Sequence, residues 1–121
     1  MVDGNNVVGA AADGWWRDPP AAVRRLLERL HCYARSSGED VVLVLDVPQP
    51  DLAEGDDGHG VEVRYATRAG RNAADDRIRE LTQRGDVVVT SDRALADDVK
   101  AAGAAVLGSG AFLSRLQQTG C

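Results

Sequence analysis

Aspartates follow the apolar runs of this sequence, each at the point where a run ends. Asp3 comes after Val2, Asp46 after the run 41–45, and Asp92 shortly after the run 87–89. These runs are typical of strands, and the carboxyl ends of parallel strands lie at one edge of a sheet, where ligands bind. We therefore expect the three carboxylates to converge at that edge.

A pair of acids, Asp75 and Asp76, belongs to the same edge for a different reason. The pair opens a helical segment that follows the run 61–65, and a crossover helix starts where the preceding strand ends. Each acid also has a simpler interpretation: the pair could complement a helix dipole behind an Asn72 cap, and Ser91 or Asp92 could cap the next helix. Their coincidence at one edge favours a site.

Several carboxylates in one pocket call for a cation. Close carboxylates repel each other, and one of them titrates at a raised pKa unless a positive charge neutralises the pair. Mg²⁺ takes oxygen ligands and combines one or two carboxylates with substrate phosphate oxygens, and it can activate water for attack on a phosphodiester. We predict a site for Mg²⁺ or Mn²⁺, which ligand hardness alone does not separate.

The elements that position these acids alternate along the chain as strand and helix. This order predicts an α/β fold: three layers, with a doubly wound, mainly parallel sheet of about five strands and helices on both faces. We expect interior strands at 41–45 and 87–89, edge strands at 61–65 and 104–107, and one long loop at 48–60. Helices are expected from Pro19 to a stop at Gly38, over about 73–84 and 93–102, and from near Ser109.

The first strand is the awkward element. Met1 and Val2 make a very short strand for the centre of a sheet. Either the strand begins upstream, or it continues through Asn6 to Val8.

Bulk properties indicate one domain over residues 1–121. With 44% hydrophobic residues and no apolar run long enough for a bilayer, we expect a soluble, cytoplasmic protein without a membrane partner. Cys32 and Cys121 suggest neither a disulfide framework nor a zinc site, and we interpret both as incidental thiols. The net charge of −5 argues against a uniformly basic nucleic-acid surface, although a cation in the acidic pocket could still receive phosphate.

Aromatic and histidine residues offer weaker signals. Trp15 and Trp16 precede the first long helix, where they could stack on bases, although we expect at least one of them to pack against the helix. His31 and His59 are interpreted as ordinary surface residues, because this chemistry needs no histidine base.

Four segments together resemble the successive motifs of the NYN domain family, in particular its YacP-like branch. They are Asp3–Gly9, Ala73–Ile78, Val88–Arg93 and Gly103–Ala104, and their order and spacing match over essentially the whole chain. The family belongs with the PIN-like nucleases, so the resemblance implies a doubly wound sheet and metal-dependent cleavage of RNA.

The resemblance also implies roles for individual residues. Asp3, Asp75 and Asp92 would hold Mg²⁺ or Mn²⁺ and act in catalysis, while Asp76 and Asp46 would complete or tune the site through water. Asp46 matches more loosely, since Val47 and Pro48 follow it where a small residue is usual. Asn6 would fix the first loop by hydrogen bonds or touch substrate, and Thr90 or Ser91 would orient a water or a phosphate. The candidates for binding RNA phosphate are Arg17, Arg71, Arg77 and Arg93.

The sequence thus predicts a metal-dependent ribonuclease, an endoribonuclease by preference, acting on mRNA, rRNA or tRNA, with the ribosome as a further candidate partner. Two alternatives stay open: an RNA- or ribosome-binding module that cleaves little, and the toxin of a toxin–antitoxin pair. A haloacid-dehalogenase-type phosphatase would need an aspartate where Pro48 stands, and neither a GxGxxG turn nor a P-loop is present.

Overall fold

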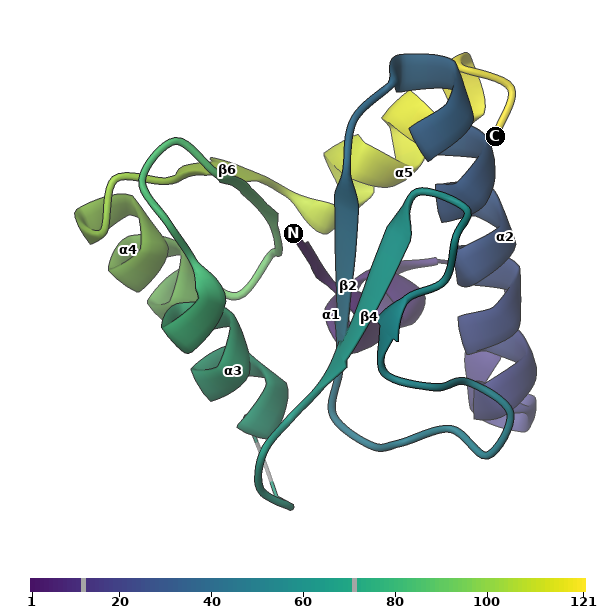
Figure 1. The fold of residues 1–121 in the computed structure, drawn as a ribbon, viewed down its shortest axis with the longest axis horizontal. Coiled ribbons are helices and arrows are strands. Elements are labelled where there is room, and N and C mark those ends of the chain that lie inside the picture. Colours follow the sequence, from purple (N-terminus) through teal and green to yellow (C-terminus); the bar gives the residue numbers. More distant parts are fainter. Residues whose placement is uncertain (12, 71) are drawn as a thin grey trace.

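The computed structural model describes residues 1–11, 13–70 and 72–121. Arg71, one of the arginines expected to contact phosphate, lies outside the described residues. A single sheet separates helices α1, α2 and α5 on one face from α3 and α4 on the other (Figure 1). The three-layer α/β architecture expected from the sequence is therefore confirmed.

The sheet has six strands in the order β3-β4-β2-β1-β5-β6. All neighbours are parallel except β3 and β4, which are antiparallel. The strands are β1 (Val2–Asp3), β2 (Val41–Leu45), β3 (Gly55–Asp56), β4 (Val61–Tyr65), β5 (Val87–Val89) and β6 (Ala105–Leu107). β3 lies inside the segment 48–60, which the sequence predicts as a loop throughout.

The helices are α1 (Gly4–Ala10), the short 3-10 helix η1 (Trp15–Arg17), α2 (Pro19–Ser37), α3 (Ala73–Leu81), α4 (Arg93–Ala101) and α5 (Ser109–Gln118). α2 begins where the Asp18 carboxylate accepts a hydrogen bond from the backbone N–H of Ala21, and it ends at Gly38 with a φ of 72°. α3 ends three residues earlier than expected. No helix in the described part of the chain is both long and apolar enough to cross a membrane.

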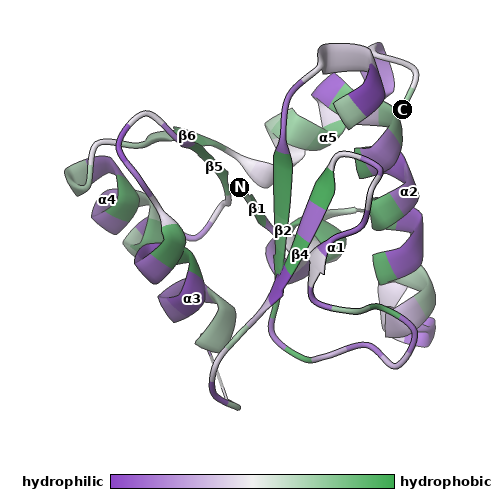
Figure 2. Ribbon diagram, in the orientation of Figure 1, coloured by the Kyte–Doolittle hydropathy of each residue, from purple (hydrophilic) through white to green (hydrophobic). Residues whose placement is uncertain are grey.

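Strand β2 supplies side chains to both layers of the core. Val41, Leu43 and Leu45 pack with α2, α1 and α5, whereas Val44 packs with α3 and α4. A strand covered on both faces needs apolar residues at every position, and Figure 2 shows β2 hydrophobic along its length while β4 is mixed.

The first strand does not continue through Asn6 to Val8. β1 has two residues, and α1 begins at once with Gly4, so Asn6 to Val8 are helical. Gly4 permits this tight junction, because a Cβ there would lie 2.7 Å from Leu45 Cδ2 and 2.9 Å from the Val44 carbonyl oxygen. The helix places Val7 and Val8 in the core.

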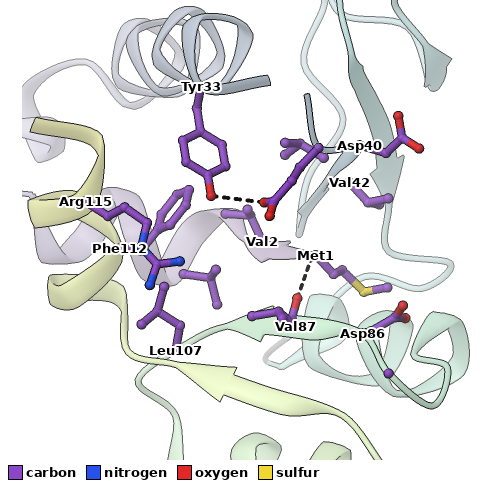
Figure 3. Close-up of a pocket in the computed structure, with 14 residues that line it drawn as sticks. Met1, Val2, Tyr33, Asp40, Val42, Asp86, Val87, Leu107, Phe112 and Arg115 are labelled. Atoms are coloured by element: carbon purple, nitrogen blue, oxygen red, sulfur yellow. Dashed lines mark hydrogen bonds between the residues drawn. The ribbon is translucent and has the colours of Figure 1, made fainter. Parts of the chain in front are cut away.

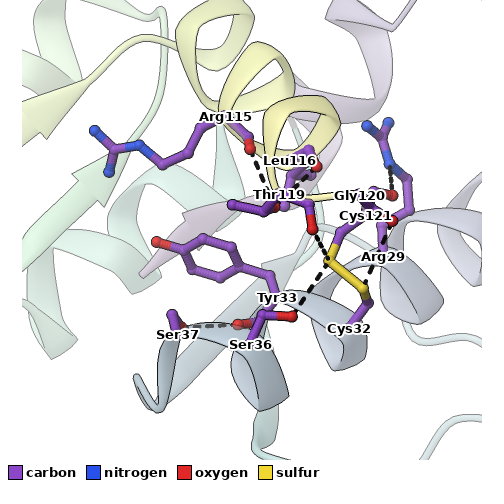
Figure 4. Close-up of a disulfide and its surroundings, with 10 residues drawn as sticks. All are labelled: Arg29, Cys32, Tyr33, Ser36, Ser37, Arg115, Leu116, Thr119, Gly120 and Cys121. Atoms are coloured by element: carbon purple, nitrogen blue, oxygen red, sulfur yellow. Dashed lines mark hydrogen bonds between the residues drawn. A yellow bond between two sulfur atoms is a disulfide. The ribbon is translucent and has the colours of Figure 1, made fainter.

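The cysteines were interpreted wrongly from the sequence. Cys32 and Cys121 form a disulfide between α2 and the end of the chain (Figure 4). The helix α5 returns the chain to α2, bringing the two Cα atoms to 5.6 Å although 89 positions separate them in sequence. Sequence spacing alone does not reveal such a long-range approach.

Candidate functional site

Asp3 occupies the centre of the acidic edge. It ends β1, pairs in register with Val44 of β2, and is 3% exposed. Its Oδ2 accepts a 2.8 Å hydrogen bond from the hydroxyl of Thr90, which is also buried. Burial, with a smaller contribution from the charges of Asp75 and Asp46, raises the pKa of Asp3 to about 6 against the opposing effect of the Thr90 hydrogen bond.

Asp75 shares this environment from the first turn of α3. Burial raises its pKa, and the carboxylates of Asp92 and Asp46 act in the same direction, while Arg79 opposes them. The structure therefore brings Asp46 close enough to raise the pKa values of both Asp3 and Asp75, and it brings Asp92 close enough to raise that of Asp75. Three strand ends and one helix start contribute one carboxylate each.

Two of these carboxylates also cap the N-termini of helices. Asp46 Oδ1 accepts a 2.9 Å hydrogen bond from the backbone N–H of Ala74, and Asp92 Oδ1 accepts one of 3.0 Å from Leu95. The cap of α3 therefore comes from the residue that follows β2, since the side chain of Asn72 makes no cap hydrogen bond. The capping interpretation and the site interpretation are both compatible with Asp92.

Amide and hydroxyl side chains tie the loops of this edge together. Asn6 Oδ1 accepts hydrogen bonds from the Ser91 backbone N–H at 2.9 Å and from the Ser109 hydroxyl at 2.5 Å. The Ser91 hydroxyl accepts a further hydrogen bond from the Ser109 N–H, and Asn5 Oδ1 accepts one from the Asp46 N–H. Sequence reasoning missed Asn5 and Ser109; the only signal was their position beside a strand end and at a helix start.

Thr90 connects two of the acids. Its hydroxyl donates to Asp3 and accepts a 3.1 Å hydrogen bond from the backbone N–H of Asp92. Ser91, by contrast, is exposed at the mouth of the site. Thr90 therefore positions carboxylates, while Ser91 is accessible to a ligand.

Asp76 differs from its neighbour Asp75. It pairs with Arg68 and with Arg79, and hydrogen bonding to Arg68 is the main cause that lowers its pKa. Arg79 also reaches Asp98 of α4 at 2.8 Å. Asp76 therefore belongs to a network of ion pairs on the outer rim.

The arginines expected to contact phosphate have different surroundings. Arg93 is exposed at the first position of α4, directly after Asp92. Arg77 lies on α3 and pairs with Glu80 at 3.3 Å. Arg17 is exposed beside Trp16, its guanidinium 6.0 Å from the ring centre, and no contact joins it to the acids within the described residues.

The two tryptophans differ in burial, as expected. Trp15 packs against the core, whereas Trp16 is 62% exposed. Trp16 is therefore the one that is free to stack on a ligand.

The donors suit a divalent cation in type and charge. They are hard carboxylate oxygens whose mutual repulsion a cation would relieve. Their positions do not form a complete ligand set: among the residues that the structure describes, no three histidine, cysteine or acidic side chains are placed to hold an ion together. The fit therefore rests on donor chemistry and on electrostatics.

A separate cavity of about 440 Å³ lies at the opposite edge of the sheet. Met1, Val41 and Val87 contribute to it from the amino ends of β1, β2 and β5, and Tyr33 and Arg115 project into it from the helices (Figure 3). It contains none of the predicted site residues.

Comparison with known proteins agrees with this architecture. The family model described as the YacP-like NYN domain matches residues 1–120. No curated protein matches the sequence.

Two crystal structures of Rae1 (YacP) from Bacillus subtilis are similar in fold. The W164L mutant superimposes with a TM-score of 0.80 at 24% identity, covering 98% of this chain and 74% of that one. A second Rae1 structure gives a TM-score of 0.76 at 23% identity, covering 98% and 72%.

Proposed function

Because the chain belongs to the YacP-like NYN domain family, which has a PIN-like nuclease fold, we propose that it is a metal-dependent ribonuclease that hydrolyses phosphodiester bonds within RNA. The observation that carries this proposal is the buried Asp3, which shares its edge of the sheet with Asp46, Asp75 and Asp92. A protein that only bound RNA would gain nothing from carboxylates that repel phosphate.

Asp3, Asp75 and Asp92 would hold Mg²⁺ or Mn²⁺, with Asp46 completing the site. When bound, such a cation supplies positive charge to a phosphate and lowers the pKa of water. Thr90 keeps Asp3 and the Asp92 backbone in place through its two hydrogen bonds. Asp76 adjusts the charge of the rim through Arg68 and Arg79.

Substrate contacts would come from the loops beside the acids. Ser91 is exposed next to Asp92, and Asn6 fixes the Ser91 loop. Arg93 begins the helix after Asp92 and is well placed to meet a phosphate, with Arg77, Arg17 and Arg71 as further candidates. Single-stranded RNA of messenger, ribosomal or transfer type would be the substrate.

The decisive experiment is cleavage of an end-labelled single-stranded RNA with Mg²⁺ or Mn²⁺, against EDTA and the double variant Asp3→Asn/Asp92→Asn. Asparagine can still cap α4, so the variant should keep its fold. Asp97→Asn is the matched control, because Asp97 is exposed on α4 away from the acids.

We expect internal cleavage that disappears with EDTA and in the double variant and persists in Asp97→Asn. RNA binding without cleavage by the native protein would instead favour a module that binds RNA or ribosomes.

A further inference from the structure

A slot lies between α2 and the loop that follows Asp46. It has a volume of about 310 Å³, within the range of small-molecule sites, which begins at roughly 300 Å³. Its apolar walls are formed by Pro20, Val23, Leu27, Pro50 and Leu52, and His31 and Gln49 also line it. A flat ring with little charge would suit these walls.

The slot lies on the same edge of the sheet as the acids. Only Val47 and Pro48 separate Asp46 from Gln49, the first slot residue of the loop. Because an extended residue spans at most about 3.6 Å, the slot begins within roughly 11 Å of Asp46 along the chain. Figure 1 shows this loop leaving the end of β2 and passing toward the N-terminal half of α2.

The loop wall of the slot is held in place by Tyr65. The Tyr65 hydroxyl donates a 2.5 Å hydrogen bond to the Leu52 carbonyl and accepts one of 3.2 Å from the Gln49 N–H. Tyr65 ends β4 and pairs in register with Leu45, the residue before Asp46. The slot is therefore preformed and fixed to β4, whose last residue lies beside the end of β2 that precedes Asp46, and this lowers the cost of ordering the slot on binding.

The rim of the slot carries hydrogen-bond acceptors. Glu28 and Asp51 line it and are exposed, and neither pairs with a cation within residues 1–11, 13–70 and 72–121. Arg24 adds a positive charge, also without an ion pair in that part of the chain. Apolar walls with free carboxylates at the mouth suit a ring that presents an amino group.

We propose that this slot binds one base of the RNA substrate beside the cleavage site and prefers bases with an exocyclic amino group to uracil; the assignment rests on the proposed function. Unstacked bases of single-stranded RNA offer apolar faces and a hydrogen-bonding edge. Aspartate and glutamate accept from the amino group of cytosine, where uracil presents a carbonyl oxygen instead. Arg24 meets an adjoining phosphate.

The test uses cytidine and uridine 5′-monophosphates as probes. Each is titrated in EDTA into the full chain with ¹³C-labelled leucine methyls, and the methyl signals of Leu27 and Leu52 are followed by NMR. We expect cytidine monophosphate to shift both signals at concentrations about fivefold lower than uridine monophosphate, the effect of roughly one hydrogen bond.

Asp51→Asn should remove most of that preference, because an amide also donates to the uracil carbonyl, and Asp97→Asn should leave it intact. Both positions are exposed, so neither variant threatens the fold.

Unchanged Leu27 and Leu52 signals, or equal responses to both nucleotides, would overturn the slot assignment even if the protein cleaves RNA. Shifts at both leucines with the cytidine preference, in a protein that cleaves no RNA, would overturn the ribonuclease proposal and leave a base-binding slot.

Discussion

Burial distinguishes Asp3 from the chain's other acids. It is the acidic residue buried to 3% exposure at the end of the central strand, with a hydroxyl as its hydrogen-bond donor. A buried carboxylate without a full counter-charge favours its protonated form. Asp3 is therefore the group through which proton and cation binding at this edge can be measured without any substrate.

Asp3→Asn should change how stability depends on pH. The folded pKa of about 6 lies above the ordinary value of 3.8, so between these values the folded chain binds a proton that the unfolded chain has released. Stability contributed by protonated Asp3 is full below 3.8 and is lost as the pH rises through 6. In urea unfolding with EDTA, we compare the free energy of unfolding of the variant with that of the native protein. The difference should shift in favour of the variant by up to about 3 kcal/mol as the pH rises from about 4 to about 7.5.

Cation binding gives the same experiment a second readout. Mg²⁺ added near neutral pH should stabilise the native protein and should stabilise Asp3→Asn much less, since ligands that bind only the folded state shift unfolding by mass action. A constant stability difference at all pH values would show that Asp3 titrates normally.

Arg93→Ala should weaken RNA binding and make the affinity less dependent on salt concentration. Losing one phosphate contact reduces the slope of log affinity against log salt by about 0.7 to 1. Arg84→Ala removes the same charge from the turn before β5, at the amino edge of the sheet, and should leave the slope unchanged. Equal slopes for Arg93→Ala and the native protein would remove Arg93 from the interface.

At the scale of secondary-structure elements, Asp46 has two roles: it belongs to the acidic edge and it caps a helix. Asp46 is close enough to Asp3 and Asp75 to raise both pKa values, and the same side chain caps α3. Its loose match to the family motif, with Pro48 nearby, says nothing about that capping role. The sequence could place Asp46 at a strand end but not show that its oxygen reaches the N-terminus of a helix 28 positions later.

Two substitutions at Asp46 should separate these roles. Asp46→Ala removes the cap and should lower the free energy of unfolding by about 1 kcal/mol, whereas Asp46→Asn keeps an acceptor for the Ala74 N–H and should lose much less. Both variants remove the charge, so both should weaken Mg²⁺ binding, which calorimetry can measure. Equal destabilisation by alanine and asparagine would argue against the cap.

Helix α1 shows where sequence reasoning could not succeed. The strands 41–45 and 87–89 and the long helix after Pro19 were predictable, because their apolar runs or helical spacing are unambiguous. Val7 and Val8 are β-branched and favour a strand locally, yet they are helical because the helix buries both of them. A helix of seven residues is stabilised by such tertiary contacts rather than by its own propensity.

Two glycines of α1 should respond to alanine in opposite ways. Gly4→Ala places a Cβ against Leu45 and the Val44 backbone and should destabilise the protein by roughly 1–3 kcal/mol. Gly9→Ala meets no atom within 4 Å and should stabilise it by about 0.5–1 kcal/mol through helix propensity. Thermal unfolding of both variants checks the junction, and destabilisation by Gly9→Ala would contradict the helix.

At the scale of the whole molecule, the fold class and the gathering of acids at one edge followed from alternating elements and parallel strand ends. The Cys32–Cys121 disulfide did not, because it depends on the path of α5 across α2. The position of β1 between β2 and β5, by contrast, agrees with the central place expected of the first strand.

Breaking the disulfide should lower stability without removing the acidic site. A cross-link spanning 89 positions restricts the unfolded chain strongly, and Cys32→Ser/Cys121→Ser should cost about 2–4 kcal/mol in free energy of unfolding. A dithiol reductant should have the same effect on the native protein and none on the variant. Identical melting temperatures with and without reductant would show that the bond contributes nothing.

The position of β1 has a consequence for the protein during its synthesis. Val2 pairs with Leu43 on one side and with Val89 on the other, and Asn6 accepts a hydrogen bond from the hydroxyl of Ser109. A ribosome makes the chain from its N-terminus, so Asp3 is synthesised before the residues that surround it in the fold. The candidate site is therefore completed only after Ser109 has been synthesised, and a polypeptide that stops before this residue lacks it.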